Sequence, residues 1–151
     1  MDGSGGFAVV WMSDQEGDQF GIFGQRFAST GAPLGPEFRV NTFTTDSQGP
    51  TAVASDAAGN FVVVWRSQYQ DGSNDGIFGQ RFDSAGAPSG PEFRINSYTT
   101  SDQSEPAVAA DALGSFVVVW KSELQGSYFH DIFGQRYRPI VPVQLLDLKM
   151  E

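Results

Sequence analysis

The sequence contains no cysteine, a single histidine and few basic residues. The absence of cysteine excludes a disulfide scaffold, a thiol nucleophile and thiolate metal sites. Lys and Arg total 9 against 18 Asp and Glu, a formal net charge of −9, so no basic stripe is present to bind nucleic acid or an anionic membrane surface. No apolar run approaches the roughly 18 residues of a membrane span, so we expect no membrane insertion.

The chain instead has a clear internal repeat. The word Phe-Ala-Val-Val-Trp at residues 7–11 returns as Phe-Val-Val-Val-Trp at 61–65 and 116–120. A second word, Gly-Ile-Phe-Gly-Gln-Arg-Phe at 21–27, recurs at 76–82 and, with two substitutions, at 131–137. We therefore expect three tandem units of about 55 residues and a tail, with these approximate bounds: 2–55, 56–110, 111–138 (partial) and 139–151.

Each unit is predicted to hold four short strands and no helix. The strands are expected at 106–110 (and 51–55), 61–65, 77–82 and 92–96. Tight turns at Asp56–Asn60 and Asp111–Ser115 separate the first two strands, because Asp can cap such a turn and Gly supplies a positive φ.

The second strand indicates the architecture. Phe-Val-Val-Val-Trp is apolar on both faces, which is typical of a strand covered on both sides. β-Propeller blades meet this condition and also have four strands each, so the predicted fold is all-β, built of propeller blades. We then expect Val62 and Val64 to be as buried as Phe61 and Val63. A β-trefoil and a β-prism remain alternatives.

Counted by strands, the chain supplies the last three of one unit, all four of the next and the first three of a third. Unpaired edges invite pairing with another chain. The tail segment Ile140–Leu146 is long and apolar enough to complete a unit as a strand, and the alternative for the tail is a linker. We expect a homo-oligomer, with a dimer that closes a six-bladed ring as the favoured state.

The words Gly-Asn-Phe-Val-Val-Val-Trp at 59–65 and Gly-Ile-Phe-Gly-Gln-Arg-Phe at 76–82 resemble a tandem repeat of large secreted or surface bacterial proteins, some of which carry hemolysin-type (RTX) calcium-binding repeats. The resemblance implies an extracellular or cell-surface location and a non-catalytic module. A few blades per chain closed by oligomerisation is also similar to the plan of small propeller lectins.

Candidate ligand-binding residues are of two kinds. The loop between the second and third strands varies in aromatic residues from unit to unit, and binding tends to sit in such variable loops. A Gln-Arg pair in the third strand could fork onto a ligand or tie neighbouring blades together. The candidates are Phe20, Tyr69, Tyr128, Phe129, Arg26, Arg81 and Arg136. The tryptophans at 11, 65 and 120 are interpreted as core residues rather than sugar platforms.

Asp71, Ser73 and Asp75 place oxygen side chains at alternate positions before a glycine, as a calcium loop does, so Ca²⁺ is a possible ligand there and no other cofactor is expected. The lone His130 has no evident catalytic partners, so we expect no enzyme. The predicted function is a secreted binding module with a glycan as ligand. The alternative is a structural or assembly repeat of a bacterial surface protein.

Overall fold

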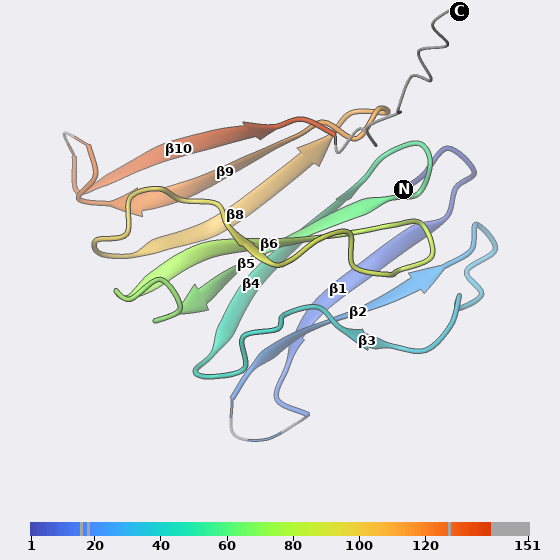
Figure 1. The fold of residues 1–151 in the computed structure, drawn as a ribbon, viewed down its shortest axis with the longest axis horizontal. Coiled ribbons are helices and arrows are strands. Elements are labelled where there is room, and N and C mark those ends of the chain that lie inside the picture. The colour runs from blue at the N-terminus through green and yellow to red at the C-terminus, as the bar shows by residue number, and fades with distance from the viewer. Residues whose placement is uncertain (16, 18, 127, 140–151) are drawn as a thin grey trace, which may run out of the picture.

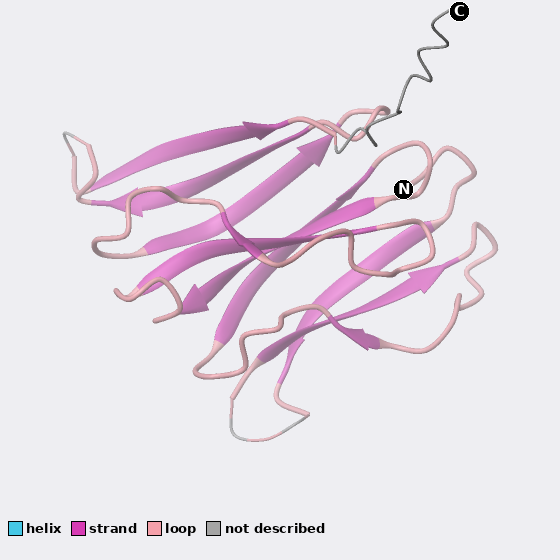
Figure 2. Ribbon diagram, in the orientation of Figure 1, coloured by secondary structure: helices cyan, strands magenta, loops and turns pink. Residues whose placement is uncertain are grey.

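This computed structural model describes residues 1–15, 17, 19–126 and 128–139, which form ten β-strands and no helix (Figure 2). The all-β prediction is therefore confirmed. No helix within these ranges could cross a membrane. The strands build three separate antiparallel sheets, numbered here in chain order. They lie one above another, from sheet 1 at the bottom of Figure 1 to sheet 3 at the top. The described strands close no barrel, which a β-trefoil would require.

Each sheet is formed by strands that follow one another in the chain. Sheet 1 contains β1 (Phe7–Ser13), β2 (Gly21–Phe27) and β3 (Phe38–Arg39). Sheet 2 contains β4 (Gln48–Ser55), β5 (Phe61–Gln68), β6 (Asp75–Phe82) and β7 (Phe93–Arg94). Sheet 3 contains β8 (Gln103–Ala110), β9 (Phe116–Glu123) and β10 (His130–Tyr137). This order of three, four and three strands matches the expected one. The proposed tail strand, at 140–146, lies outside the described residues.

The first strand of each unit is longer than predicted, because it continues through a proline. β4 begins at Gln48 and β8 at Gln103, three residues earlier than expected in each case. The pairing register shifts between Gly49 and Thr51, and again between Ser104 and Ala107. Proline has no backbone N–H to donate to the neighbouring strand. A β-bulge at this point accommodates the missing hydrogen bond, and the strand continues.

The fourth strand is shorter than predicted, at two residues in β3 and in β7. In sheet 2 the backbone N–H of Ile95 still donates to Ile77 O at 2.8 Å. The next acceptor is a side chain, because Ile77 N–H donates to Asn96 Oδ1 at 2.7 Å. The asparagine side chain thus replaces the backbone carbonyl that a longer strand would offer.

Turns between the first and second strands follow the expected mechanism. Asp56 Oδ1 accepts hydrogen bonds from the backbone N–H groups of Ala58 and Asn60, each at 2.9 Å. Gly59 takes the left-handed conformation, φ 88°, that the turn requires. Asp2 and Asp111 make the same pair of bonds in their own units. The repeated aspartates are therefore turn residues.

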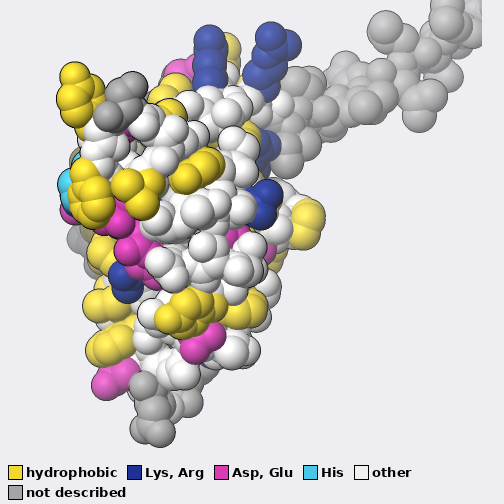
Figure 3. Space-filling model, turned by 90° about the vertical axis from the view of Figure 1, so that its left-hand side faces the viewer, with side chains coloured by type: hydrophobic (Ala, Val, Ile, Leu, Met, Phe, Trp, Pro, Cys, Tyr) yellow, Lys and Arg dark blue, Asp and Glu magenta, His cyan; other side chains and the backbone are white. Residues whose placement is uncertain are grey.

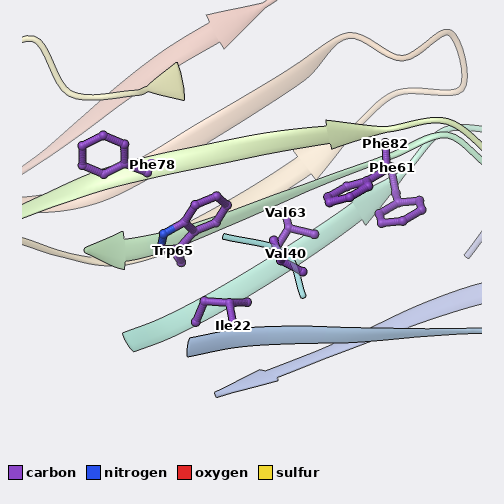
Figure 4. Packing of buried hydrophobic residues seen from close by; sticks show 7 residues of the cluster. All are labelled: Ile22, Val40, Phe61, Val63, Trp65, Phe78 and Phe82. Carbon is purple, nitrogen blue, oxygen red and sulfur yellow. The ribbon is translucent and has the colours of Figure 1, made fainter. Parts of the chain in front are cut away.

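The core lies between the sheets in two repeat-related clusters. Between sheets 1 and 2, the fully buried Trp65 and Val63 of β5 face Ile22 of β2 (Figure 4). Phe61 and Phe82 stack at 4.9 Å between ring centroids at one end of this cluster. Between sheets 2 and 3 the equivalent positions are occupied by Trp120, Val118, Ile77, Phe116 and Tyr137. Trp65 and Trp120 are therefore core residues, as interpreted.

Burial of the valine rows depends on how many neighbours a sheet has. In sheet 2, Val62 is 4% exposed and Val64 0%, against 5% for Phe61 and 0% for Val63, which confirms the expectation of burial on both faces. In sheet 3 the same word leaves Val117 42% and Val119 40% exposed. Sheets 1 and 3 have a neighbouring sheet on one side only, so one face of each is open.

Substitution of Gly79 tests the packing of the fourth strand. A Cβ on Gly79 would lie 3.2 Å from both Phe93 Cζ and Ile95 Cδ1. We expect Gly79→Val to lower the free energy of unfolding by about 1–3 kcal/mol through overpacking, measured by urea denaturation. Gly134 is the repeat-equivalent control, because it is exposed and its Cβ would meet only Val119 Cγ1 and Val118 O. Equal effects of the two substitutions would contradict this account.

Candidate ligand-binding cleft

The glutamine and the arginine of the Gln-Arg pair in the third strand make different contacts. Gln80 is 2% exposed, and its Nε2 donates to Gly90 O at 2.9 Å. Gln25 makes the same bond to Gly35 O at 3.0 Å. The glutamine therefore holds the loop that leads to the fourth strand, which is a structural role.

Arg26 joins sheet 1 to sheet 2. Its Nη1 donates to Ser84 O, 58 residues away in the turn that follows β6 of sheet 2, at 2.7 Å. Its Nη2 donates to Leu34 O at 3.3 Å. Of the two roles that the sequence left open for this residue, the geometry supports the tie between neighbouring units.

Arg81 occupies the repeat-equivalent position in sheet 2 but makes different contacts. Its guanidinium carbon lies 4.9 Å from the ring centroid of Phe116, 5.7 Å from that of Phe93 and 5.9 Å from that of Tyr137. These are cation–π distances. No hydrogen bond joins the guanidinium to a residue in the described part of the chain. The counterpart of Ser84 in the third unit is Pro139, 55 residues later, and the Arg81 guanidinium makes no hydrogen bond to it.

The two arginines line two repeat-related clefts of very different size. The cleft between sheets 1 and 2, which Arg26 crosses, has a volume of only about 30 Å³. The cleft between sheets 2 and 3 has a volume of about 680 Å³. Its lining is mostly apolar and includes Ala54, Val62 and Ala110. The polar lining residues are Arg81, Asp56, Asn60 and Ser89. We call this space the Arg81 cleft.

Electrostatics in the Arg81 cleft leave one charge without an opposite partner. Burial lowers the pKa of Arg81, and Tyr137 opposes this effect, but an arginine remains a cation. Burial also raises the pKa of Tyr137. The carboxylate of Asp56 is engaged by its own turn, including Asn60 Nδ2 at 2.8 Å. Among the charged lining residues, the guanidinium is thus the one that the cleft offers to a ligand.

The loop aromatics lie at the opposite end of the strands, seen face-on in Figure 3. Tyr69, Tyr128 and Phe129 are 53%, 75% and 62% exposed, and Phe20 is 41% exposed. Each unit contributes its own loop, and hydrophobic side chains form separate groups on this end with acidic ones between them (Figure 3). Tyr69 has a left-handed backbone, φ 57°, which is strained for a non-glycine residue. These residues are accessible, and neither of the two clefts described above includes them.

Two of the three proposed calcium residues, Asp71 and Asp75, already have side-chain partners. Asp75 Oδ2 accepts from Arg66 Nη1 at 2.8 Å, and Asp71 Oδ2 accepts from Asn96 Nδ2 at 3.2 Å. Burial raises the pKa of Asp75, and the Arg66 charge opposes this rise. Within the described ranges no three His, Cys, Asp or Glu residues gather as a metal site would need. A calcium ion would have to compete with these partners, and its binding stays a prediction.

The structure contains a buried network of amide side chains that the sequence analysis did not predict. Asn96 Nδ2 donates to Gln103 Oε1 at 3.0 Å, and Gln103 Nε2 donates to Thr100 O at 3.0 Å. Asn41 and Gln48 repeat this arrangement, with 2.9 Å between Asn41 Nδ2 and Gln48 Oε1. The network holds the connection from one sheet to the next. Its signal was present as a third repeated word, Asn-x-(Phe/Tyr)-Thr-Thr-x-x-Gln at 41–48 and 96–103.

Comparison with known proteins gives a likeness of fold alone. No protein-family profile matches the chain, and no curated protein matches it in sequence. Among solved structures, an endo-arabinase from Bacteroides thetaiotaomicron is similar with a TM-score of 0.51 at 15% sequence identity. The likeness covers 87% of this chain and 51% of the endo-arabinase, so the chain spans about half the length of that protein.

Proposed function

We propose that the chain is a non-catalytic carbohydrate-binding module of propeller blades that takes an acidic glycan in the Arg81 cleft. The observation that carries this proposal is the partly buried guanidinium of Arg81, which has no hydrogen-bond or carboxylate partner among the described residues. A desolvated cation without an anionic partner is costly, and a guanidinium pairs well with a carboxylate through two parallel hydrogen bonds.

Three further observations support the ligand class and the lack of catalysis. The mostly apolar lining of the cleft suits the hydrophobic face of a sugar ring. The similar solved structure bears the name of a carbohydrate-active enzyme. The one carboxylate among the residues that line the cleft, Asp56, is engaged by its own turn rather than placed for acid–base chemistry. The resemblance of the repeat words to secreted and surface proteins supports an extracellular place for the module.

Removal of the Arg81 charge is the direct test. Titration calorimetry with an oligogalacturonide, which carries carboxylates, should detect binding by the unaltered chain, and a neutral arabino-oligosaccharide should bind more weakly. Arg81→Gln should reduce affinity for the oligogalacturonide about 10–100-fold, the worth of a charge-assisted hydrogen bond. Arg94→Gln is the matched control, because Arg94 is exposed on the same sheet and its loss removes the same charge.

Two results would contradict the proposal. Equal affinities of Arg81→Gln and Arg94→Gln would place any glycan elsewhere. Loss of binding in Tyr69→Ala or Tyr128→Ala, with Arg81→Gln unaffected, would move the site to the aromatic loops at the other end of the strands. Failure of the unaltered chain to bind either oligosaccharide would remove the acidic-glycan assignment.

A further inference from the structure

The outer face of sheet 1 and the outer face of sheet 3 resemble the two surfaces that pack together between successive sheets inside the chain. In sheet 2, Phe61, Val63 and Trp65 pack toward sheet 1, and Val62 and Val64 pack toward sheet 3. Because side chains alternate along a strand, the same positions in sheets 1 and 3 have the same directions. Ala8 and Val10 of sheet 1 face sheet 2, so Phe7, Val9 and Trp11 face outward.

We call the outer side of sheet 1 the head face, with Phe7, Val9, Trp11 and Phe27. Val9 is 43% exposed. Phe7 and Phe27 stack at 5.2 Å, as Phe61 and Phe82 do at 4.9 Å inside the molecule. The internal pair is covered by Phe38 of the preceding sheet, 5.4 Å from Phe82. The head face thus presents the half of the interface that sheets 2 and 3 bury.

We call the outer side of sheet 3 the tail face, with Val117, Val119, Ile132 and Arg136. Ile132 pairs with Lys121 and Arg136 with Val117, which places both on the same side as the exposed valines. Ile132 is 73% exposed, whereas its repeat equivalents Ile22 and Ile77 are fully buried against the next sheet. The tail face thus presents the other half of the same interface.

Polar contacts between successive units would also continue across these faces. The turns of the three units form a ladder, in which Gly3 N–H donates to Ala57 O at 3.1 Å and Ala57 N–H to Ala112 O at 3.3 Å. The next donor in this series is Ala112 N–H, and the next acceptor would be Gly3 O of another copy. Arg136 is likewise placed as Arg26 is toward Ser84 O, with Ser29 O of another copy as its counterpart.

We propose that the tail face of one copy of this chain binds the head face of a second copy, repeating the contact that sheets 1 and 2 make within the chain. The two faces are complementary to each other and not each to itself. The contact is therefore head to tail, which closes into a ring or extends as a fibre depending on the rotation between copies. The second copy is favoured over an unrelated partner because the same pair of faces already packs twice inside the molecule.

Sedimentation velocity of three single variants tests the proposal. Val9→Glu alters the head face and Val119→Glu the tail face, both at exposed positions where the fold should survive, as checked by circular dichroism. Thr44→Glu adds the same charge at an exposed position away from both faces. We expect the unaltered chain and Thr44→Glu to sediment as an assembly of two or more copies, and each face variant alone as a monomer.

A mixture of the two face variants distinguishes head-to-tail binding from other pairings. Val9→Glu keeps an intact tail face and Val119→Glu an intact head face, so the mixture should form a one-to-one dimer that neither variant forms alone. A monomeric unaltered chain at high micromolar concentration would overturn the proposal. So would a mass of Val9→Glu or Val119→Glu alone equal to that of the unaltered chain, because a face would then pair with itself or not be used.

Discussion

Replacement of Trp65 by alanine is expected to lower the free energy of unfolding by about 3–5 kcal/mol, enough to unfold a marginally stable domain. The indole is fully buried between sheets 1 and 2, in the cluster that includes Ile22, Val40 and Phe78. Its Nε1 has no hydrogen-bond partner among the described residues, so the loss is one of packing and burial. Urea denaturation monitored by circular dichroism measures the effect.

Trp11→Ala is the control for this experiment. Trp11 is the repeat equivalent of Trp65, but it is only half-buried on the open side of sheet 1. At concentrations where the chain is monomeric, Trp11→Ala should lower the free energy of unfolding clearly less than Trp65→Ala does. A Trp65→Ala protein that keeps its unfolding midpoint but loses glycan binding would instead make Trp65 a ligand platform.

Asn96→Ala should also be strongly destabilising, because it breaks the buried amide network. The substitution leaves Ile77 N–H without its acceptor and Gln103 Oε1 without its donor, in a region where both polar side chains are almost fully buried. Each buried polar group left unpaired costs about 1–3 kcal/mol, so the total should approach that of a core truncation. Urea denaturation measures the total, and faster hydrogen exchange at the Ile77 amide locates it.

Asn60→Ala is the matched control for Asn96→Ala. Asn60 Nδ2 donates to Asp56 Oδ2, and Asn60 Oδ1 accepts from Ser84 N–H at 3.1 Å; both bonds are exposed, so water replaces them when they are lost. Its effect on the free energy of unfolding should stay below about 1.5 kcal/mol, the usual net worth of a hydrogen bond. Similar unfolding midpoints for the two variants would mean that the Asn–Gln network contributes little.

Local features of the fold could be predicted where a short word determines its own structure. The apolar run at 61–65 indicated a strand, and the Asp56 turn was expected from side-chain capping alone. Strand ends were less predictable. The bulges beside Pro50 and Pro106 lengthen β4 and β8, and the Asn96 side chain ends β7, since these limits depend on partners in other strands.

Candidate binding residues divided in the same way. Residue type and repetition singled out Arg26 and Arg81 equally, because their local sequences are identical. Their contacts differ because the next sheet offers Ser84 O to Arg26, while the rings of Phe116 and Tyr137 lie beside Arg81. Exposure of Tyr69 and Tyr128 was expected of loops, but whether they share a pocket is a matter of distances between sheets.

The sequence by itself determined that this protein is a threefold β repeat, because hydrophobic periodicity and turn residues act over a few neighbouring positions. Only the tertiary structure decided which faces of each repeated segment are buried. Phe-Val-Val-Val-Trp is buried on both faces at 61–65 and on one face at 116–120, although the letters are the same. The physical reason is that burial is set by what packs against a strand, and sheet 2 has two neighbours where sheet 3 has one.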